Sequence, residues 1–162
     1  MPELPEVETL RRGLAASLQA RRIASVQVLN PDLRTPLHAA NLRRRLRGRR
    51  IARVDRRAKY LLLELDDAQV LVLHLGMSGQ FLLVAAAAPL LPHTHVRLGL
   101  DDGRELRFVD PRRFGMFFVV SRAALPRHPR FVALGPEPFA RTFTPAYLQE
   151  RARGVRRAVR AR

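Results

Sequence analysis

Eight short apolar segments follow one another along this chain at nearly regular spacing. Turn signals separate several of them, such as the Asp66–Asp67 pair and the Asp-Asp-Gly run at 101–103. Strands of this length and pitch favour an antiparallel sandwich or barrel over a parallel sheet with crossover helices. The segments are IASVQVL, IARVDR, KYLLLEL, VLVLHL, QFLLVA, THVRLGL, ELRFV and GMFFVV, between residues 23 and 120.

Two amphipathic segments indicate helices beside these strands. Residues 5–19 continue an apolar face with spacings of three and four, and Pro5 suits a first helical turn. Glu6 and Glu8 complement the positive end of that helix. A second short helix is expected at 38–47. The predicted fold class is therefore α+β, an eight-stranded antiparallel β-sandwich flanked by helices. The apolar face of the first helix comprises Leu4, Val7, Leu10, Leu14 and Leu18.

The C-terminal part of the chain has a different composition. Residues 125–144 are proline-rich and indicate a linker, placed at 131–143, after a sandwich domain at 1–130. Thr144 is a suitable N-cap and Pro145 a suitable first residue for a helix. Residues 144–162 are therefore expected to begin a helical domain.

The charge of the chain indicates a polyanionic partner. It has 30 Lys and Arg against 14 Asp and Glu, a formal net charge of +16. Nucleic acid is the first candidate and an anionic membrane surface the second. The longest apolar stretch is broken by Pro89 and is too short to span a bilayer. We expect a monomeric cytoplasmic protein, associated with the nucleoid rather than with a membrane.

Metal ligands are sparse in this sequence. There is no cysteine, so neither a disulfide framework nor a cysteine zinc site is available. His93 and His95 would lie on one side of a strand, and no acidic cluster is nearby. No metal site is therefore expected in this chain.

The chain begins Met-Pro-Glu, which is suited to amine chemistry. Removal of Met1 before the small residue Pro2 would free a secondary amine. A terminal amine has a reference pKa near 8 against about 10.4 for lysine, and so has about 300-fold more free base at neutral pH. Attack on a sugar C1′ would give an iminium that acts as an electron sink, with Glu3 placed to move protons. An ordinary lead-in to a helix is the alternative.

Four internal residues could also carry chemistry. Lys59 is the only lysine, and arginine cannot replace lysine as a proton donor or amine nucleophile. Phe114, in the run FVDPRRFG, is either a wedge into stacked bases or a core residue of a basic hairpin. Met77, between two glycines in HLGMSGQ, is either a flexible apolar probe or a buried plug. His74 is either a phosphate contact or a structural histidine.

Taken together, these motifs resemble the bacterial formamidopyrimidine-DNA glycosylases. MPELPEVETLRRGL, RRAKYLLLEL, HLGMSGQ, DPRRFG and LGPEP occur in the order and approximate spacing of that family. The family excises 8-oxoguanine and ring-opened purines and then cleaves the abasic strand. The resemblance implies that Pro2 is the Schiff-base nucleophile, Glu3 the proton donor, and Lys59 a proton donor or phosphate contact at the lesion.

The same resemblance assigns five DNA contacts. Met77, Arg112 and Phe114 would fill the space left by a flipped nucleotide, with Arg112 facing the orphaned cytosine and Phe114 wedging the stack. His74 and Arg113 would contact phosphates. The implied partner is double-stranded DNA that contains oxidised purines or abasic sites.

One departure from the family pattern affects the expected activity. Family members continue into a helix–two-turn–helix domain and a zinc finger of four cysteines, whereas this chain ends in what resembles the first helix of that domain. Partial activity is therefore expected. The alternatives are a non-catalytic DNA-binding module and an oxidised-pyrimidine glycosylase of the same superfamily.

Overall fold

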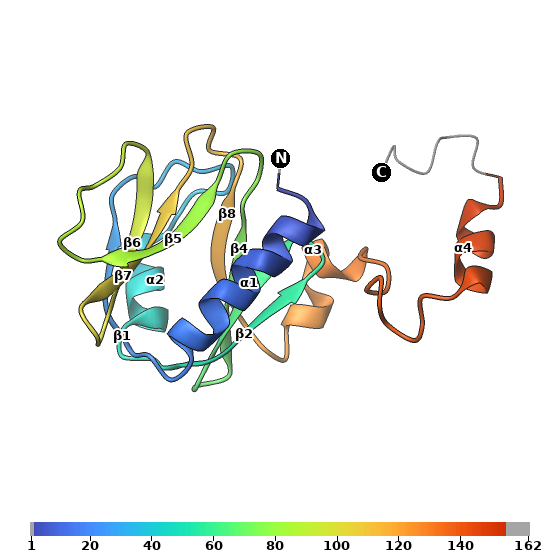
Figure 1. Cartoon of the computed structure of the whole chain (residues 1–162), viewed down its shortest axis with the longest axis horizontal. Helices are drawn as coiled ribbons and strands as arrows, with labels where there is room; N and C mark the ends of the chain where they lie inside the picture. Colours follow the sequence, from blue (N-terminus) through green and yellow to red (C-terminus); the bar gives the residue numbers. More distant parts are fainter. Residues whose placement is uncertain (1, 155–162) are drawn as a thin grey trace. The chain divides into compact units, whose positions relative to one another are not determined.

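The computed structural model describes residues 2–154 and contains all eight predicted strands (Figure 1). The helices predicted at 5–19 and 38–47 are also present, as α1 and α2. The elements are α1 (Leu4–Leu18), β1 (Ile23–Val28), α2 (Ala39–Leu46), β2 (Ile51–Arg57), β3 (Tyr60–Leu65), β4 (Gln69–His74), β5 (Gln80–Ala85), β6 (Thr94–Leu100), β7 (Arg104–Val109), β8 (Met116–Ser121), the 3₁₀ turn η1 (Leu125–Arg127), α3 (Pro129–Val132) and α4 (Pro145–Ala152).

The strands form two four-stranded antiparallel sheets, which confirms the predicted sandwich. One sheet has the order β1-β6-β7-β5 and the other β2-β3-β4-β8. Alternation along β6 places Val96, Leu98 and Leu100 in the core, whereas Arg97 points outward and pairs with Glu105. The core is therefore built from the inward positions of both sheets, as the period of two requires.

The two N-terminal helices cover different parts of the sandwich. Helix α1 packs on β2 and β3, and α2 packs on β1 and β8. Val7, Leu14 and Leu18 of the predicted apolar face are buried, while Leu4 and Leu10 are half-buried. The amphipathic spacing thus identified the face that α1 turns toward the strands.

The chain divides into two compact units, Met1–Val132 and Ala133–Arg162. Phe131 on α3 is buried in the first unit, with its ring centroid 4.8 Å from that of Tyr60. In the second unit the Thr144 hydroxyl accepts a hydrogen bond from the Tyr147 amide at 3.1 Å, which confirms the predicted N-cap of α4. The part of the predicted C-terminal helix at 155–162 lies outside the described residues.

Three motifs meet at one end of the β2-β3-β4-β8 sheet. Tyr60 pairs with His74, and His74 pairs with Met116. The β2–β3 turn, the loop after β4 and the loop before β8 therefore open at the same end. These segments carry RRAKY, HLGMSGQ and DPRRFG, so strand pairing brings together residues that are far apart in the sequence.

None of the helices within residues 2–154 combines the length and apolar character needed to cross a membrane.

Candidate active site

The start of α1 holds the first two candidate catalytic residues. Glu3 is the N-cap of this helix, and its backbone N–H donates to the Glu6 carboxylate at 3.1 Å. Pro2 immediately precedes the cap, at the positive end of the helix dipole. Glu6 therefore has the helix-start role expected from the sequence, and the capping geometry fixes the backbone that carries Pro2 and Glu3.

Lys59 joins this end of the chain through an ion pair. Its Nζ lies 2.6 Å from the Glu3 carboxylate, although the two residues are 56 positions apart. Lys59 sits in the tight β2–β3 turn, where Ala58 has a positive φ of 49°. Glu3 and Lys59, two of the predicted catalytic residues, are thus in direct contact, and Pro2 is the next residue along the chain.

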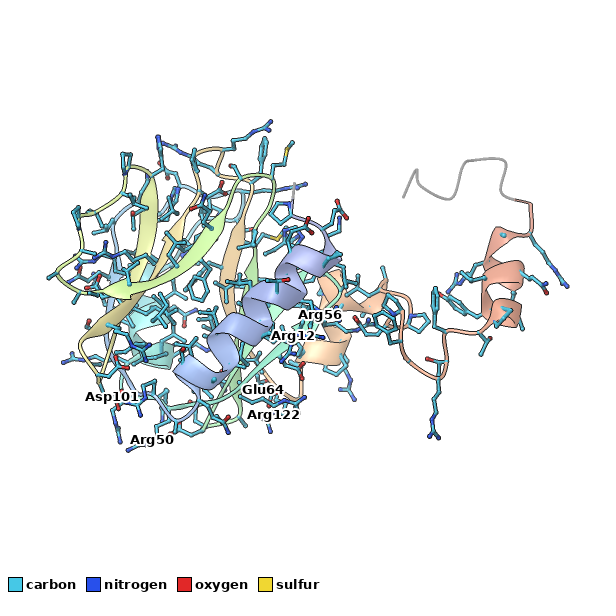
Figure 2. The ribbon with its side chains drawn as sticks, viewed as in Figure 1. Arg12, Arg50, Arg56, Glu64, Asp101 and Arg122 are labelled. Carbon is cyan, nitrogen blue, oxygen red and sulfur yellow. The ribbon has the colours of Figure 1, made fainter. Side chains whose placement is uncertain are left out.

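Glu8 links α1 to the hairpin that carries Lys59 by binding Arg56, which Figure 2 labels beside α1. Its carboxylate accepts from Arg56 Nε at 3.0 Å, and Arg56 also donates to the Ala58 carbonyl at 2.9 Å within the turn. The hydrogen bond from Arg11 holds the pKa of Glu8 far below its ordinary value; burial opposes this shift, and Arg12 and Arg56 add to it. Glu8 is therefore a charged link between the two segments that carry the candidate catalytic residues, beyond the helix-end role that its position predicted.

His74 lies where β4 ends, beside this cluster. Its Nδ1 accepts from the Gly76 amide at 3.0 Å, so the proton of the neutral ring is on Nε2. Burial lowers the pKa of His74 below its ordinary 6.5, and the nearby charges of Lys59, Arg130 and Arg34 lower it further. The imidazole is therefore mainly neutral at pH 7 and can offer a phosphate one N–H donor.

The two predicted insertion side chains lie at the surface. Met77 is 40% exposed and Phe114 is 42% exposed. The guanidinium carbon of Arg112 lies 5.3 Å from the centroid of the Phe114 ring, a cation–π distance. This exposure favours the probe and the wedge over the two buried alternatives.

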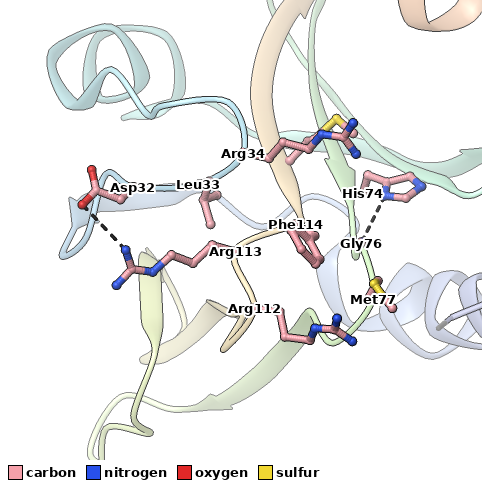
Figure 3. A pocket seen from close by; sticks show the side chains of 10 residues that line it. Asp32, Leu33, Arg34, His74, Gly76, Met77, Arg112, Arg113 and Phe114 are labelled. Carbon is pink, nitrogen blue, oxygen red and sulfur yellow. Dashed lines mark hydrogen bonds and ion pairs between the residues drawn. The ribbon is translucent and has the colours of Figure 1, made fainter.

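A pocket of about 810 Å³ opens around these side chains (Figure 3). Figure 3 shows the Phe114 ring among the residues that line it, and Arg113 pointing toward Asp32 at 3.9 Å. The remaining lining comes from segments far apart in the sequence. The lining residues are Asp32, Leu33, Arg34, His74, Gly76, Met77, Arg112, Arg113, Phe114 and Met116.

The loop between β1 and α2 was not expected at this site. Asp32, Leu33 and Arg34 line the pocket, and the Arg34 amide donates to the Arg113 carbonyl at 2.7 Å. Their sequence, PDLRTP, combines turn residues with one leucine and one arginine, which is no specific signal of a site. Arg34 adds a cation to the pocket that holds Arg112 and Arg113.

The residues near the pocket offer few groups that could bind a metal ion. His95 is 1% exposed, and its two ring nitrogens lie 3.1 and 3.0 Å from the carbonyls of Asn30 and Asp110. Residues 2–154 contain no cluster of three or more His, Cys, Asp or Glu that could hold a metal ion. Because the chain has no cysteine, its residues do not fit the four-cysteine zinc finger of the resembled family.

Known proteins are similar to this chain over nearly its whole length. A family model described as the formamidopyrimidine-DNA glycosylase N-terminal domain matches residues 1–117. The chain is 48% identical over 160 residues to the formamidopyrimidine-DNA glycosylase of Thioalkalivibrio sulfidiphilus, covering 99% of this chain and 58% of that protein. It is 45% identical over 163 residues to that of Dinoroseobacter shibae, covering 95% and 57%.

Solved structures give the same result. The Lactococcus lactis formamidopyrimidine-DNA glycosylase, non-covalently bound to DNA with an AP site, matches with a TM-score of 0.85 and 31% identity, over 94% of this chain and 58% of that one. The same enzyme with DNA containing an oxidised pyrimidine matches with a TM-score of 0.86 and 32% identity, over 94% and 57%.

The chain spans 57–58% of the length of these curated relatives. Within that span the similarity is continuous from the first residue through the two loops of the pocket. The fold, the order of the motifs and the comparisons agree, and the chain therefore belongs to the formamidopyrimidine-DNA glycosylase family.

Proposed function

We propose that this protein is a DNA glycosylase and AP lyase that removes oxidised purines and acts on abasic sites through Pro2. The observation that carries the proposal is the 2.6 Å contact of Glu3 with Lys59, directly after Pro2 and at the same sheet end as the Met77 and Phe114 loops. Its substrates would be 8-oxoguanine and formamidopyrimidines in double-stranded DNA. It would act as a monomer on nucleoid DNA in the cytoplasm.

The Pro2 amine, freed by removal of Met1, is the nucleophile. On an abasic site its nitrogen adds to the C1′ aldehyde, and loss of water gives an iminium. Loss of a C2′ proton converts the iminium into an enamine, and the enamine nitrogen then pushes its electron pair back, which breaks the C3′–O bond, expels the 3′-phosphate and leaves a conjugated iminium. The iminium of a secondary amine keeps its positive charge because its nitrogen has no proton to lose, which sustains the electron sink.

Glu3 and Lys59 manage the protons of this reaction. Glu3 protonates the C1′ hydroxyl that leaves as water when the iminium forms, because it follows the nucleophile directly in the chain. Lys59 donates to Glu3 and lies 33% exposed, so it can also meet a phosphate of the lesion. The Glu8–Arg56 link supports this arrangement, since it ties α1 to the Lys59 turn.

The pocket loops hold the DNA. Met77, Arg112 and Phe114 fill the space of the extruded nucleotide, with Arg112 toward the orphaned cytosine. His74 and Arg113 contact phosphates near the lesion. The lowered pKa of His74 supports a neutral hydrogen-bond donor rather than an ion pair at this position.

Cleavage of abasic DNA tests the proposal. The full chain, with removal of Met1 checked by mass spectrometry, is incubated with a duplex containing one abasic site, and nicking is followed on a denaturing gel. We expect nicking by the parent and about a 100-fold slower reaction for Glu3→Gln, the scale of lost general acid–base catalysis.

The matched control is Glu64→Gln. Glu64 also forms an exposed-surface ion pair, with Arg122 at 2.7 Å, but it lies toward the other end of β3. This variant should nick at the parental rate. DNA binding without nicking by the parent would assign the chain as a non-catalytic DNA-binding module. Nicking that is unaffected by Glu3→Gln would remove Glu3 from the mechanism.

Phe114→Ala and Met77→Ala are expected to impair lesion recognition more than folding. Both side chains are about 40% exposed, so their loss should change the free energy of unfolding by about 0.5 kcal/mol or less. Affinity for abasic duplex should fall relative to intact duplex, because the space in the stack is no longer filled. The measurements are thermal melting and competition binding.

Phe108→Ala provides the core reference for this prediction. Phe108 is fully buried, and its truncation should cost about 3–5 kcal/mol. If the Phe114 or Met77 variant melts at as low a temperature as Phe108→Ala, the substituted residue is a structural plug rather than a probe.

A further inference from the structure

We propose that Asp110 and Ser78 are positioning residues that join the two pocket loops into one rigid unit. The loop at 75–79 carries Met77, and the loop at 110–115 carries Arg112 and Phe114. This inference rests on the proposed function, because it concerns how those three side chains are presented to DNA.

Asp110 is the centre of this unit. It is 0% exposed, and its carboxylate accepts hydrogen bonds from both loops. One oxygen accepts from the Ser78 hydroxyl at 2.9 Å, and the other accepts from the Gly115 amide at 2.7 Å. The Arg112 amide adds a longer contact of 3.3 Å. A single buried carboxylate thus fixes the residue after Met77 and the residues on both sides of the Arg113–Phe114 tip.

The two loops also touch through their backbones. A Cβ on Gly76 would lie 2.6 Å from the Phe114 carbonyl carbon and 2.7 Å from the Gly115 nitrogen, and Gly76 has a φ of +62°. A Cβ on Gly115 would lie 3.0 Å from the His74 carbonyl oxygen. Only glycine permits this close approach of the two backbones, so the loops are in contact at the residues next to Met77 and Phe114.

The backbone of Asp110 is anchored to the strand pair behind it. Its N–H donates to the His93 carbonyl at 3.0 Å, and its carbonyl oxygen lies 3.0 Å from His95 Nε2. The Arg113 amide closes the turn on the same carbonyl at 3.3 Å. The unit is therefore held against the sandwich, although the side chains at its tips are exposed.

Rigid presentation has a specific consequence for binding. Unstacking a base step costs a few kcal/mol, which the inserted side chains must offset. Side chains already held in place lose less conformational entropy on insertion than side chains on two independent loops. Loss of the Ser78–Asp110 hydrogen bond should therefore reduce discrimination for distorted DNA while general attraction to phosphate is unchanged.

Ser78→Ala in the full chain is the test. We expect the preference for abasic over intact duplex to fall about tenfold, the scale of one hydrogen bond to a charged group, with affinity for intact duplex unchanged. Ser78→Thr keeps the hydroxyl and should restore the preference. Ser121→Ala removes a hydroxyl that accepts from the Ala124 amide near the far end of β8, and should have no effect.

A double-mutant cycle separates positioning from simple contact. In the parent, the effects of Met77→Ala and Phe114→Ala on abasic preference should be non-additive, because one unit carries both. In the Ser78→Ala background they should become additive. Additive effects in the parent, or an unchanged preference in Ser78→Ala, would overturn the proposal.

Amide hydrogen exchange tests the unit without DNA. Ser78→Ala should speed exchange in 75–79 and also at the Gly115 amide across the interface, whereas Ser121→Ala should not. Faster exchange confined to 75–79 would overturn the inference. If the parent shows no preference for abasic DNA but Ser78→Ala still speeds exchange in both loops, the proposed function is overturned. The inference that the two loops form one unit would then still hold.

Discussion

Borohydride is expected to trap this chain covalently on abasic duplex DNA through Pro2, and to trap nothing once the Pro2 amine is blocked. Reduction converts the iminium between Pro2 and C1′ into a stable amine, so the cross-link records the intermediate itself. Peptide mass spectrometry of the trapped complex locates the linked residue.

The physical basis is that imine formation at an abasic site requires fewer steps than excision of a damaged base. There is no base to expel, and the ring-opened aldehyde is already electrophilic. Removal of an intact 8-oxoguanine also requires the nucleotide to be extruded and held, which costs a few kcal/mol of unstacking. The residues proposed for imine formation lie at positions 2, 3 and 59, within the segment that matches the family model. We therefore expect trapping on abasic DNA to be faster than excision of 8-oxoguanine.

Two variants control the trapping experiment. Retention of Met1, or acetylation of the freed Pro2 amine, blocks the secondary amine and should abolish the cross-link. Lys59→Arg keeps a cation beside Glu3 but removes the primary amine of the site. It should slow the reaction without moving the cross-link. A cross-link found only at Lys59, or none despite a free Pro2 amine and measurable DNA binding, would contradict the assignment of Pro2.

The strands and helices could be predicted because their signals are local. The alternation of Val96, Leu98 and Leu100 on β6 and the spacing of three and four along α1 both follow from the geometry of a single element. Strand order is not local: β1 pairs with β6, and β5 pairs with β7. The sequence indicated a sandwich but not which strands would be neighbours.

The candidate site divides in the same way. Its motifs were visible in the sequence, but their contacts depend on long-range pairing. The spacing of Glu8 from Arg11 and Arg12 predicts ion pairs along one helix, yet its contact with Arg56 depends on how α1 packs on β2. The Asp-Pro pair at 110–111 is a local turn signal, but nothing local indicated that the Asp110 carboxylate would be buried between two loops. The exposure of Met77 was likewise undetermined, since an apolar residue between glycines suits either a plug or a probe.

DNA affinity is expected to fall steeply with salt, with a slope set by the cations of the pocket end rather than by net charge. Each phosphate contact on duplex DNA contributes about −0.9 to the slope of log K against log salt. Arg34, Arg112 and Arg113 lie at this end, whereas the neighbouring Lys59 is already paired with Glu3, which predicts a slope of about −2.7. Affinity should then drop about 40-fold between about 50 and 200 mM salt.

The ion pairs within the chain explain why the formal charge of +16 overstates the number of phosphate contacts that the chain makes with DNA. If every excess cation met a phosphate, the slope would approach about −14. Many arginines instead bind acidic side chains of the same chain: Arg11, Arg12 and Arg56 bind Glu8, Arg97 and Arg107 bind Glu105, Arg104 binds Asp102 and Arg122 binds Glu64. These cations are already partly neutralised, so they release few counterions on binding.

Arg113→Gln and Arg122→Gln form a matched pair for this prediction. The two arginine side chains are 51% and 53% exposed, but only Arg113 lines the pocket, and its contact with Asp32 at 3.9 Å is exposed and weak. Arg113→Gln should make the slope shallower by about 0.9, whereas Arg122→Gln should leave it unchanged. The measurement is a salt titration of duplex affinity. A slope that responds equally to both variants would mean that DNA reads the net charge of the chain, and a flat titration would remove DNA as the partner.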